Sequence, residues 1–238
     1  MDKKEWSKSW EARLSEYSSG IPRTGIFIKS YLKHIKTSLE LGCGSARDSI
    51  MLSSKGLEVT ASDYEPTLIN ALKDINKDKN VVFSVVDASK TGFKDNSYDL
   101  VFHNGLFIYF NDNEIVSMLK EHSRISAKYL LIIVHNGKNQ RQKDIFAKKG
   151  ETDPVYNISF FDVERLKKLL QLSEVKNKSV KFYKFGGKAD ILYGKKIKSL
   201  PNFLYPFREK IIPRLYQFQR WEKTERIACL VKFENSLH

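Results

Sequence analysis

The chain has 238 residues, of which 41% are hydrophobic and 29% are charged, a balance typical of one soluble globular domain rather than a disordered chain. Its two cysteines, Cys43 and Cys229, are too few for a disulfide framework or a cysteine-based metal site. No apolar run is long enough to cross a bilayer, and the lysine-rich start has no signal-peptide core. We therefore expect a cytoplasmic protein that needs no metal.

The formal net charge of the chain is +13. Such a balance is typical of proteins that bind nucleic acid or an anionic membrane surface. The lysines, however, are spread along the whole chain, with modest clusters only at 176–188 and 195–198. We interpret most of the charge as a solvated surface, and nucleic acid is a disfavoured partner.

The first predicted element is an amphipathic helix over residues 4–19. Trp6, Trp10, Leu14 and Tyr17 recur there at helical spacing and would share one face. Packing of this face on the domain is the simplest interpretation. The segment from 20 to 25 contains two glycines and a proline that break the helix, and a second helix is expected over 25–36.

A glycine turn between a strand and a helix is the clearest motif in the chain. A strand is predicted over 37–41, followed by Gly42-Cys43-Gly44 and by a helix that ends near Gly56. Two glycines at such a turn let a ligand approach the main chain closely. Amides at the start of the helix favour a polar or anionic group of that ligand.

An acidic residue ends the next predicted strand, 57–63. This residue, Asp63, comes 19 positions after Gly44, the reach of one helix and one strand. A carboxylate there can accept hydrogen bonds from both hydroxyls of a ribose, so turn and acid together indicate a nucleoside cofactor. A dinucleotide-binding turn would have a third glycine or alanine where this chain has Arg47, so a pyrophosphate-binding loop fits poorly.

Strands and helices continue to alternate through the rest of the chain. Further helices are predicted over 66–77, 113–124 and 161–172, and further strands over 80–86, 97–104, 128–135, 180–185 and 225–233. This alternation predicts an α/β fold with a doubly wound sheet. Ligands of such sheets bind at the carboxyl ends of the strands, near the point where the strand order reverses.

Four motifs in order resemble those of class I S-adenosylmethionine-dependent methyltransferases of the small-molecule type. They are the glycine turn, Asp63 after the second strand, Val85-Val86-Asp87-Ala88 after the third strand, and the fourth strand from Ser97 to Asn104. The resemblance covers residues 37–136. It implies a Rossmann-like, seven-stranded, mostly parallel sheet with an antiparallel last strand. It also implies S-adenosyl-L-methionine as the cofactor and methyl transfer as the activity.

The resemblance further implies the residues of the site. Asp63 would bind the ribose, Asp87 and Ala88 would bind the adenine, and Glu40 would fix the loop or the methionine amine. Arg23 would meet the methionine carboxylate, with a surface arginine as the alternative. The cofactor-binding set is then Tyr17, Arg23, Glu40, Gly42, Cys43, Gly44, Asp63, Tyr64, Asp87, Ala88, His103 and Asn104.

Two histidines near strand ends are candidate catalytic bases. His103 and His135 could each take a proton from a hydroxyl near neutral pH, and a hydrogen-bonded structural histidine is the alternative for each. The segment 103–110 has no proline, whereas methyltransferases that act on nucleobase amines carry a proline-containing motif there. Neither cysteine follows the fourth or fifth strand, as methylation of a pyrimidine carbon would require.

We expect one domain, 1–238, with four parts. Residues 1–36 would form a helical cap, 37–136 the cofactor-binding core, 137–160 a substrate-side loop, and 186–224 an insertion before the last strand. The insertion combines aromatic and basic residues. It is interpreted as a helix that covers the core, as a lid over the acceptor, or, through 195–221, as a patch that contacts a membrane surface.

The favoured function is methyl transfer to an oxygen or nitrogen of a small or medium-sized acceptor, such as a sugar or a lipid- or polysaccharide-linked precursor. Two alternatives stay open. An RNA methyltransferase is supported by the charge and by Phe182, Tyr183 and Phe185 among lysines. A non-catalytic module that binds the cofactor or a partner chain is the other alternative.

Overall fold

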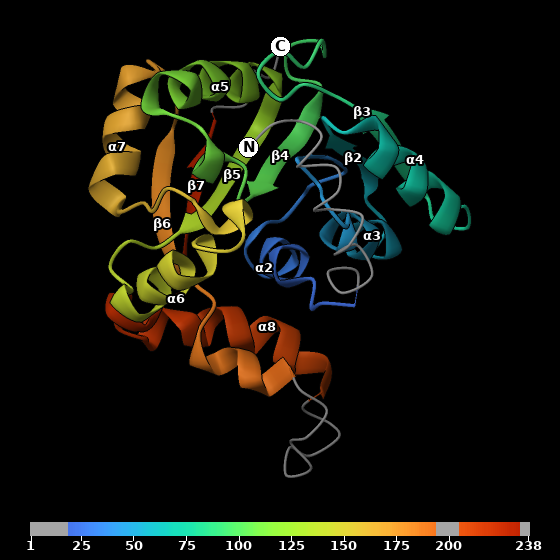
Figure 1. Ribbon diagram of the computed structural model, residues 1–238. Helices are drawn as coiled ribbons and strands as arrows, with labels where there is room; N and C mark the ends of the chain where they lie inside the picture. Colours follow the sequence, from blue (N-terminus) through green and yellow to red (C-terminus); the bar gives the residue numbers. More distant parts are fainter. Residues whose placement is uncertain (1–18, 194–204, 234–238) are drawn as a thin grey trace.

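Seven strands form one sheet in the order β3-β2-β1-β4-β5-β7-β6 (Figure 1). The computed structural model describes residues 19–193 and 205–233. The strands are β1 (Thr37–Leu41), β2 (Glu58–Asp63), β3 (Val81–Val85), β4 (Tyr98–Asn104), β5 (Ser126–His135), β6 (Ser179–Phe185) and β7 (Arg226–Lys232). β1 to β5 are parallel, and β7 runs antiparallel between β5 and β6. The predicted doubly wound, seven-stranded sheet with an antiparallel last strand is confirmed.

The strand order reverses at β1, which pairs with β2 on one side and with β4 on the other. Leu39 lies opposite Thr60 of β2 and Val101 of β4. The connections that follow β1 and β4 therefore leave the sheet towards opposite faces, the arrangement in which doubly wound sheets bind ligands at their carboxyl edge. The glycine turn begins at this edge, directly after β1.

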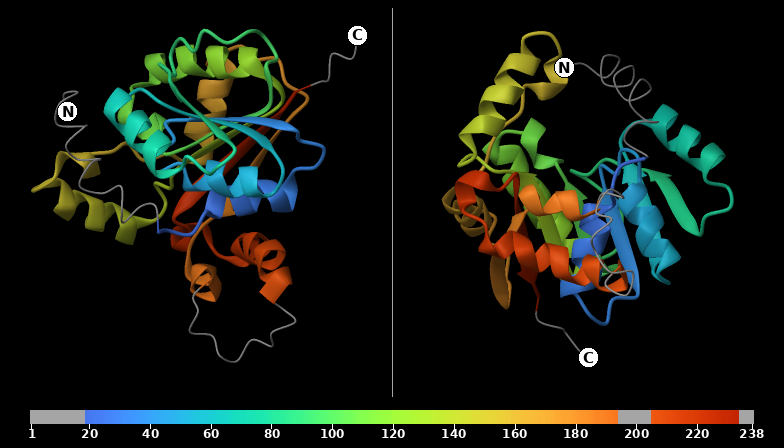
Figure 2. Two further views of the ribbon diagram at one scale, coloured as in Figure 1. Left: turned by 90° about the vertical axis from the view of Figure 1, so that its right-hand side faces the viewer. Right: turned by 90° about the horizontal axis from the view of Figure 1, so that it is seen from below.

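Helices cover both faces of the sheet, as Figure 2 shows. On one face lie α2 (Arg23–Tyr31), α3 (Arg47–Ser54) and α4 (Pro66–Ile75), and on the other lie α5 (Asp112–Ile125) and α7 (Val163–Leu172). In β5, Leu131 and Ile133 pack towards α2 and α3, whereas Leu130 and Ile132 pack towards α5 and α7. Successive side chains of a strand point to opposite faces of the sheet, and both faces are covered here. The central strand β5 is therefore apolar at consecutive positions.

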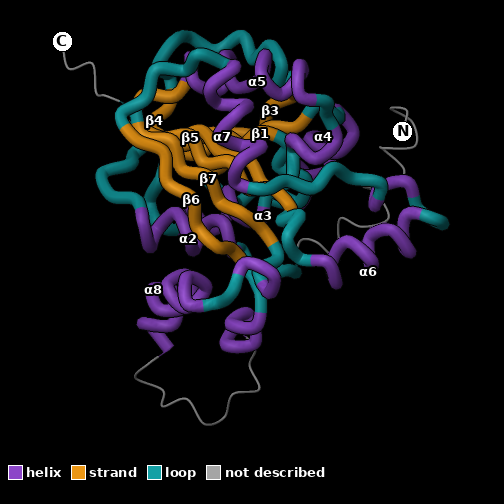
Figure 3. Tube along the Cα trace, turned by 90° about the vertical axis from the view of Figure 1, so that its left-hand side faces the viewer, coloured by secondary structure: helices purple, strands orange, loops and turns teal. Residues whose placement is uncertain are grey.

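The segment 137–160 differs from its predicted form. It contains helix α6 (Gln140–Gly150) and the 3₁₀ helix η2 (Pro154–Tyr156), so the prediction of a loop is wrong. The structure buries no side chain of α6, and Figure 3 shows this helix outside the layers of the sheet. A helix with no buried side chain has no need of the apolar stripe by which a helix is predicted. The N-terminus of α6 is capped by the Asn139 side chain, which accepts from the Gln142 amide.

The insertion before β7 forms a small helical layer at one end of the domain. Its described elements are η3 (Lys188–Tyr193), α8 (Tyr205–Leu215), η5 (Tyr216–Phe218) and η6 (Trp221–Lys223). The layer packs on α2, since the Ser30 hydroxyl donates to the Glu209 carbonyl at 2.8 Å and Tyr31 donates to the Pro213 carbonyl at 3.1 Å. Residues 4–18 of the predicted helix 4–19, Tyr17 among them, lie outside the described residues. None of the described helices is both long and apolar enough to cross a membrane.

Asn136 fixes the end of β5 to the turn that precedes β7. Its Nδ2 donates to the Trp221 carbonyl at 2.8 Å and to the Thr224 carbonyl at 3.0 Å, and its side chain is buried. Asn136→Ala should lower the free energy of unfolding by about 1–3 kcal/mol, because buried carbonyls lose a donor. Urea denaturation measures this change.

Asn177→Ala is the matched control, because its Nδ2 also donates to a carbonyl, that of Val175, but in an exposed turn. The control should change the free energy of unfolding by about 0.5 kcal/mol or less. An equal effect of the two substitutions would contradict the role given to Asn136.

Candidate functional site

The chain leaves β1 through a turn with left-handed backbone angles. The φ angles are 64° at Gly42, 50° at Gly44 and 52° at Ala46. A Cβ atom at Gly42 would lie 3.1 Å from the Leu106 side chain, so this position requires glycine for its backbone angle and has little room for a side chain. The Cys43 amide donates to the Ser62 carbonyl at 2.8 Å, which fixes the turn to the end of β2.

Asp63 lies directly against the glycine turn. Its Oδ2 accepts from the Gly44 amide at 3.2 Å, and its Oδ1 accepts from the Glu65 amide at 3.2 Å. Burial raises the pKa of this carboxyl group, and the backbone hydrogen bonds oppose the rise. The structure thus brings together the glycine turn and Asp63, as the spacing of 19 positions between Gly44 and Asp63 predicts. Tyr64, the next residue of the predicted set, is 46% exposed.

The turn after β3 continues the same edge of the sheet. The Val86 amide donates to the Asp63 carbonyl at 2.9 Å, and Asp87 accepts from the amide and the hydroxyl of Ser89 at 2.8 and 2.7 Å. The Ala88 carbonyl accepts from His122 Nε2 of α5 at 2.9 Å. Burial lowers the pKa of His122 to about 4, so its ring is neutral at pH 7. Sequence analysis missed His122, whose one signal is its place in the apolar stripe of a helix.

Two buried acids lie beneath the turn, Glu40 in β1 and Asp48 in α3. Glu40 accepts from the Ser49 hydroxyl at 2.6 Å, and Asp48 accepts from the Gly25 amide at 2.9 Å. Burial raises the pKa of both carboxyl groups, and the charge of Asp48 raises that of Glu40 further. Asp48 also ties the start of α2 to the start of α3. Sequence analysis did not select Asp48, although it follows the glycine turn in the first turn of a helix.

A half-buried arginine lies next to the acids, on the β5 side. Arg226 begins β7, pairs across the sheet with His135, and donates from Nη1 to the Asn104 side-chain oxygen. Among the described residues its Nε has no hydrogen-bond partner. Burial and repulsion by Arg23 lower its pKa to about 10. Arg226 could not be selected from the sequence, because nothing local marks an arginine that begins a strand as a partner of Asn104.

Arg23 lies at the start of α2 and contacts two carboxylates. Its Nη1 is 3.0 Å from Glu225 Oε2 and also forms a short ion pair with Asp190. Asp190 accepts in addition from the Tyr216 hydroxyl. These contacts join α2 to η3 and to the residue before β7. A contact between Arg23 and a methionine carboxylate stays a prediction.

The two candidate bases lie on opposite faces of the sheet. The His103 ring is fully buried towards α5, with its centroid 4.2 Å from Phe107 and 5.5 Å from His122. The His135 ring lies on the α2 face, with its centroid 4.8 Å from Phe146 of α6 and beside Arg226. Burial holds the pKa of both rings well below the usual histidine value, so both are neutral at pH 7. A catalytic role for either ring stays a prediction.

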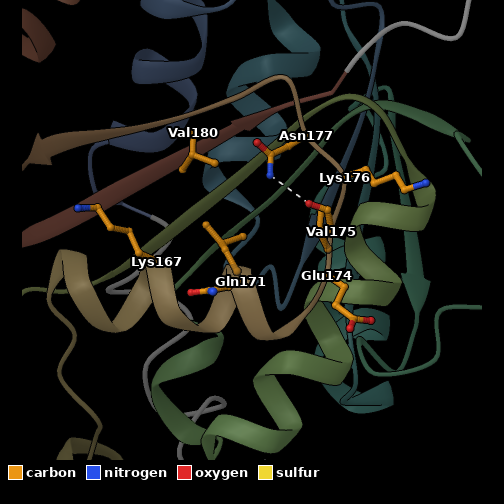
Figure 4. Close-up of a pocket in the computed structure, with 8 residues that line it drawn as sticks. Lys167, Gln171, Glu174, Val175, Lys176, Asn177 and Val180 are labelled. Carbon is orange, nitrogen blue, oxygen red and sulfur yellow. Dashed lines mark hydrogen bonds between the residues drawn. The ribbon is translucent and has the colours of Figure 1, made fainter.

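A separate pocket lies at the opposite edge of the sheet, between α7 and the start of β6. Its volume is about 430 Å³. Figure 4 shows Lys167, Gln171, Glu174, Val175, Lys176, Asn177 and Val180 around it. None of these residues belongs to the glycine turn or to the acids beside it. Because ligands of doubly wound sheets bind at the carboxyl edge, this pocket is not the candidate site.

Replacement of Glu40 by Gln removes a buried titrating group. A carboxyl group whose pKa is raised by folding destabilises the folded state as it ionises, so its effect grows as the pH rises above about 4.3, the unfolded value. The free energy of unfolding of Glu40→Gln should therefore fall less between pH 5 and pH 8 than that of the native chain.

Urea denaturation at the two pH values measures the difference. The control is Glu58→Gln, at an exposed position that begins β2, and its pH dependence should follow that of the native chain. The same pH dependence in Glu40→Gln as in the native chain would refute the assignment of a raised pKa.

Comparison with known proteins agrees with this geometry. Residues 39–128 match a family model described as a methyltransferase domain. Phosphoethanolamine N-methyltransferase 1 of Triticum aestivum is 38% identical over 88 residues, which are 35% of this chain and 18% of that enzyme. The match thus spans less than a fifth of the length of this relative.

Solved structures share the fold at low sequence identity. A methyltransferase from Archaeoglobus fulgidus aligns with a TM-score of 0.60 and 19% identity, over 91% of this chain and 96% of its own. Magnesium protoporphyrin IX methyltransferase from Synechocystis, with bound S-adenosylhomocysteine, aligns with a TM-score of 0.54 and 13% identity. This alignment covers 95% of this chain and 83% of that enzyme. The ordered motifs, the strand order and the match of residues 39–128 to a methyltransferase domain together support a class I S-adenosylmethionine-dependent methyltransferase.

Proposed function

We propose that the chain transfers a methyl group from S-adenosylmethionine to an oxygen or nitrogen of a small or medium-sized acceptor. The observation that carries this proposal is the contact of Asp63 with the glycine turn, 3.2 Å from its Oδ2 to the Gly44 amide nitrogen. The bound S-adenosylhomocysteine of the Synechocystis structure and the name of the wheat relative support it. When bound, the cofactor supplies a methyl group activated on a sulfonium.

The residues at the carboxyl edge fit such a cofactor. At Gly42 the Leu106 side chain fills the space that a Cβ would occupy, and the left-handed backbone of the turn is kept by glycine. Asp63 offers carboxylate oxygens for the ribose hydroxyls, and the turn of Asp87 and Ala88 lies beside it for the adenine. Glu40, beneath the turn, holds α3 through Ser49 and so positions the loop.

The acceptor would lie at the ends of β4 and β5, where Asn104, His135 and Arg226 meet. His135 is the better placed of the two predicted bases, because His103 packs between the sheet and α5. Arg226 is a half-buried cation whose buried Nε lacks a hydrogen-bond partner among the described residues. An anion there would form a charge-assisted hydrogen bond and offset the cost of burial. We therefore propose an acceptor that carries an acidic group, a phosphate or a carboxylate.

The rate enhancement would come mainly from positioning. The chain holds the two reactants at one edge of the sheet, and orientation of this kind contributes without a strong base. The described part of the insertion reaches this edge through Arg23, which contacts Asp190 and Glu225. We propose that this part closes over the acceptor and excludes water.

The acceptor can be identified by methyl transfer from a labelled cofactor. The chain is incubated with a metabolite extract and with cofactor labelled in its methyl group, and the labelled product is analysed. Label found only in RNA would contradict a small acceptor.

Removal of the Asp63 charge should weaken cofactor binding. The loss of charge-assisted hydrogen bonds of about 1.5–3 kcal/mol predicts that Asp63→Asn binds S-adenosylhomocysteine about 10- to 150-fold more weakly. Isothermal titration calorimetry measures the affinity. The control is Asp74→Asn on the exposed side of α4, which should bind as the native chain does. Unchanged affinity of Asp63→Asn would refute its role.

Replacement of His135 should affect turnover more than binding. If His135 takes the proton of the acceptor, His135→Asn should lower kcat by about 10²- to 10⁴-fold, with little change in the affinity for S-adenosylhomocysteine. His103→Asn serves as the comparison and should leave kcat within about threefold once its folding is verified by circular dichroism. An unaltered kcat of His135→Asn would leave positioning as the whole mechanism.

A further inference from the structure

Helix α8 presents a row of exposed side chains away from the domain. In Figure 1 this helix projects beyond one end of the sheet and its flanking helices. Its buried side is formed by Ile212 and by Tyr216 just beyond its end, both 1% exposed, which pack with Ile26 of α2. The opposite side of α8 therefore faces away from the core.

Large apolar side chains are exposed on α8 and on the two 3₁₀ helices that contact it. Phe207 and Ile211 are 51% and 41% exposed and lie one helical turn apart. Phe218 of η5 is 86% exposed, and Ile191 of the adjacent η3 is 72% exposed. One exposed apolar side chain is ordinary on a protein surface, but several in one small layer indicate an interaction site.

Two cations lie between these apolar side chains. Lys210 and Arg214 are exposed and follow Phe207 at positions i+3 and i+7, on the same side of α8. Within the described ranges neither of them forms an ion pair. Two acids of this layer are occupied, since Asp190 binds Arg23 and Tyr216, and Glu222 is 3.5 Å from Arg220. Glu209, the acid of α8 itself, is half-buried, and its carbonyl accepts from Ser30 of α2. The row is therefore positive as well as apolar.

A positive and apolar row on a helix fits the interface of an anionic bilayer. Such a helix lies in the plane of the interface, with its apolar side chains below the headgroups and its cations among the phosphates. Ile191 and Ile211 have no aromatic face on which a base could stack, so RNA would leave them exposed. We propose that α8, η3 and η5 dock on an anionic lipid membrane through six exposed side chains, which together are called the α8 outer surface. They are Ile191, Phe207, Lys210, Ile211, Arg214 and Phe218.

Docking there would place the candidate site close to the membrane. The α8 outer surface is joined to α2 through Tyr216, Asp190 and Arg23, and α2 is joined to the glycine turn through Asp48. The docking inference itself uses only exposure and charge, so it holds or fails independently of the proposed methyl transfer.

The test is co-sedimentation of the full chain with two kinds of vesicle, phosphatidylcholine alone and phosphatidylcholine mixed with phosphatidylglycerol. We expect binding to the anionic vesicles, little binding to the neutral ones, and weaker binding as the salt concentration rises. Lys210→Gln combined with Arg214→Gln should lower the partition coefficient about 30-fold, from about 1 kcal/mol for each cation. Phe207→Ser combined with Phe218→Ser should lower it at least about 10-fold.

The matched control removes two exposed lysines far from α8, by Lys176→Gln combined with Lys178→Gln. This control has the same net charge as the Lys210 and Arg214 variant and should bind the anionic vesicles within about threefold of the native chain. The inference is overturned by equal binding to neutral vesicles, by no binding to anionic vesicles, or by an equal loss in the control. It is also overturned if a single-stranded RNA oligonucleotide displaces the chain from the vesicles and the variants of the α8 outer surface abolish RNA binding.

Discussion

The hydrogen bond from the Gly44 amide to the Asp63 carboxylate is the contact on which the candidate site depends. It joins the turn after β1 to the end of β2, and the Val86 amide extends the connection to the turn after β3. The contact lies where the strand order reverses at β1, the place at which doubly wound sheets bind their ligands. If the turn or the acid moved, the surface proposed for the nucleoside would be lost.

Charge is divided across the site in a way that suits the proposed reaction. Buried acids lie beneath the glycine turn, whereas Arg226 lies at the ends of β4 and β5. A cationic sulfonium is compatible with the first region, and an acidic group of the acceptor is compatible with the second. The acids are buried and Arg226 is half-buried, so charges interact there more strongly than in water. The same residues would therefore bind the two reactants and fix their orientation.

Much of the fold could be predicted because its signals are local. The glycine turn, the apolar strands and the ordered motifs each lie in a short stretch, and the structure pairs Gly44 with Asp63 as their spacing indicates. α6 could not be predicted, because the structure buries none of its side chains. Arg226 and His122 were missed because their contacts are with partners far away in the chain, Asn104 and Ala88. Similarly, only the sheet register places His103 and His135 on opposite faces.

A crystal structure of the chain with S-adenosylhomocysteine tests the central claim most directly. The account predicts that both ribose hydroxyls lie within about 2.5–3.2 Å of the Asp63 carboxylate oxygens, with the adenine beside Asp87 and Ala88. It also predicts that the homocysteine sulfur lies on the side of the glycine turn that faces His135 and Arg226. A ligand bound elsewhere, or a ribose without contact to Asp63, would contradict the account.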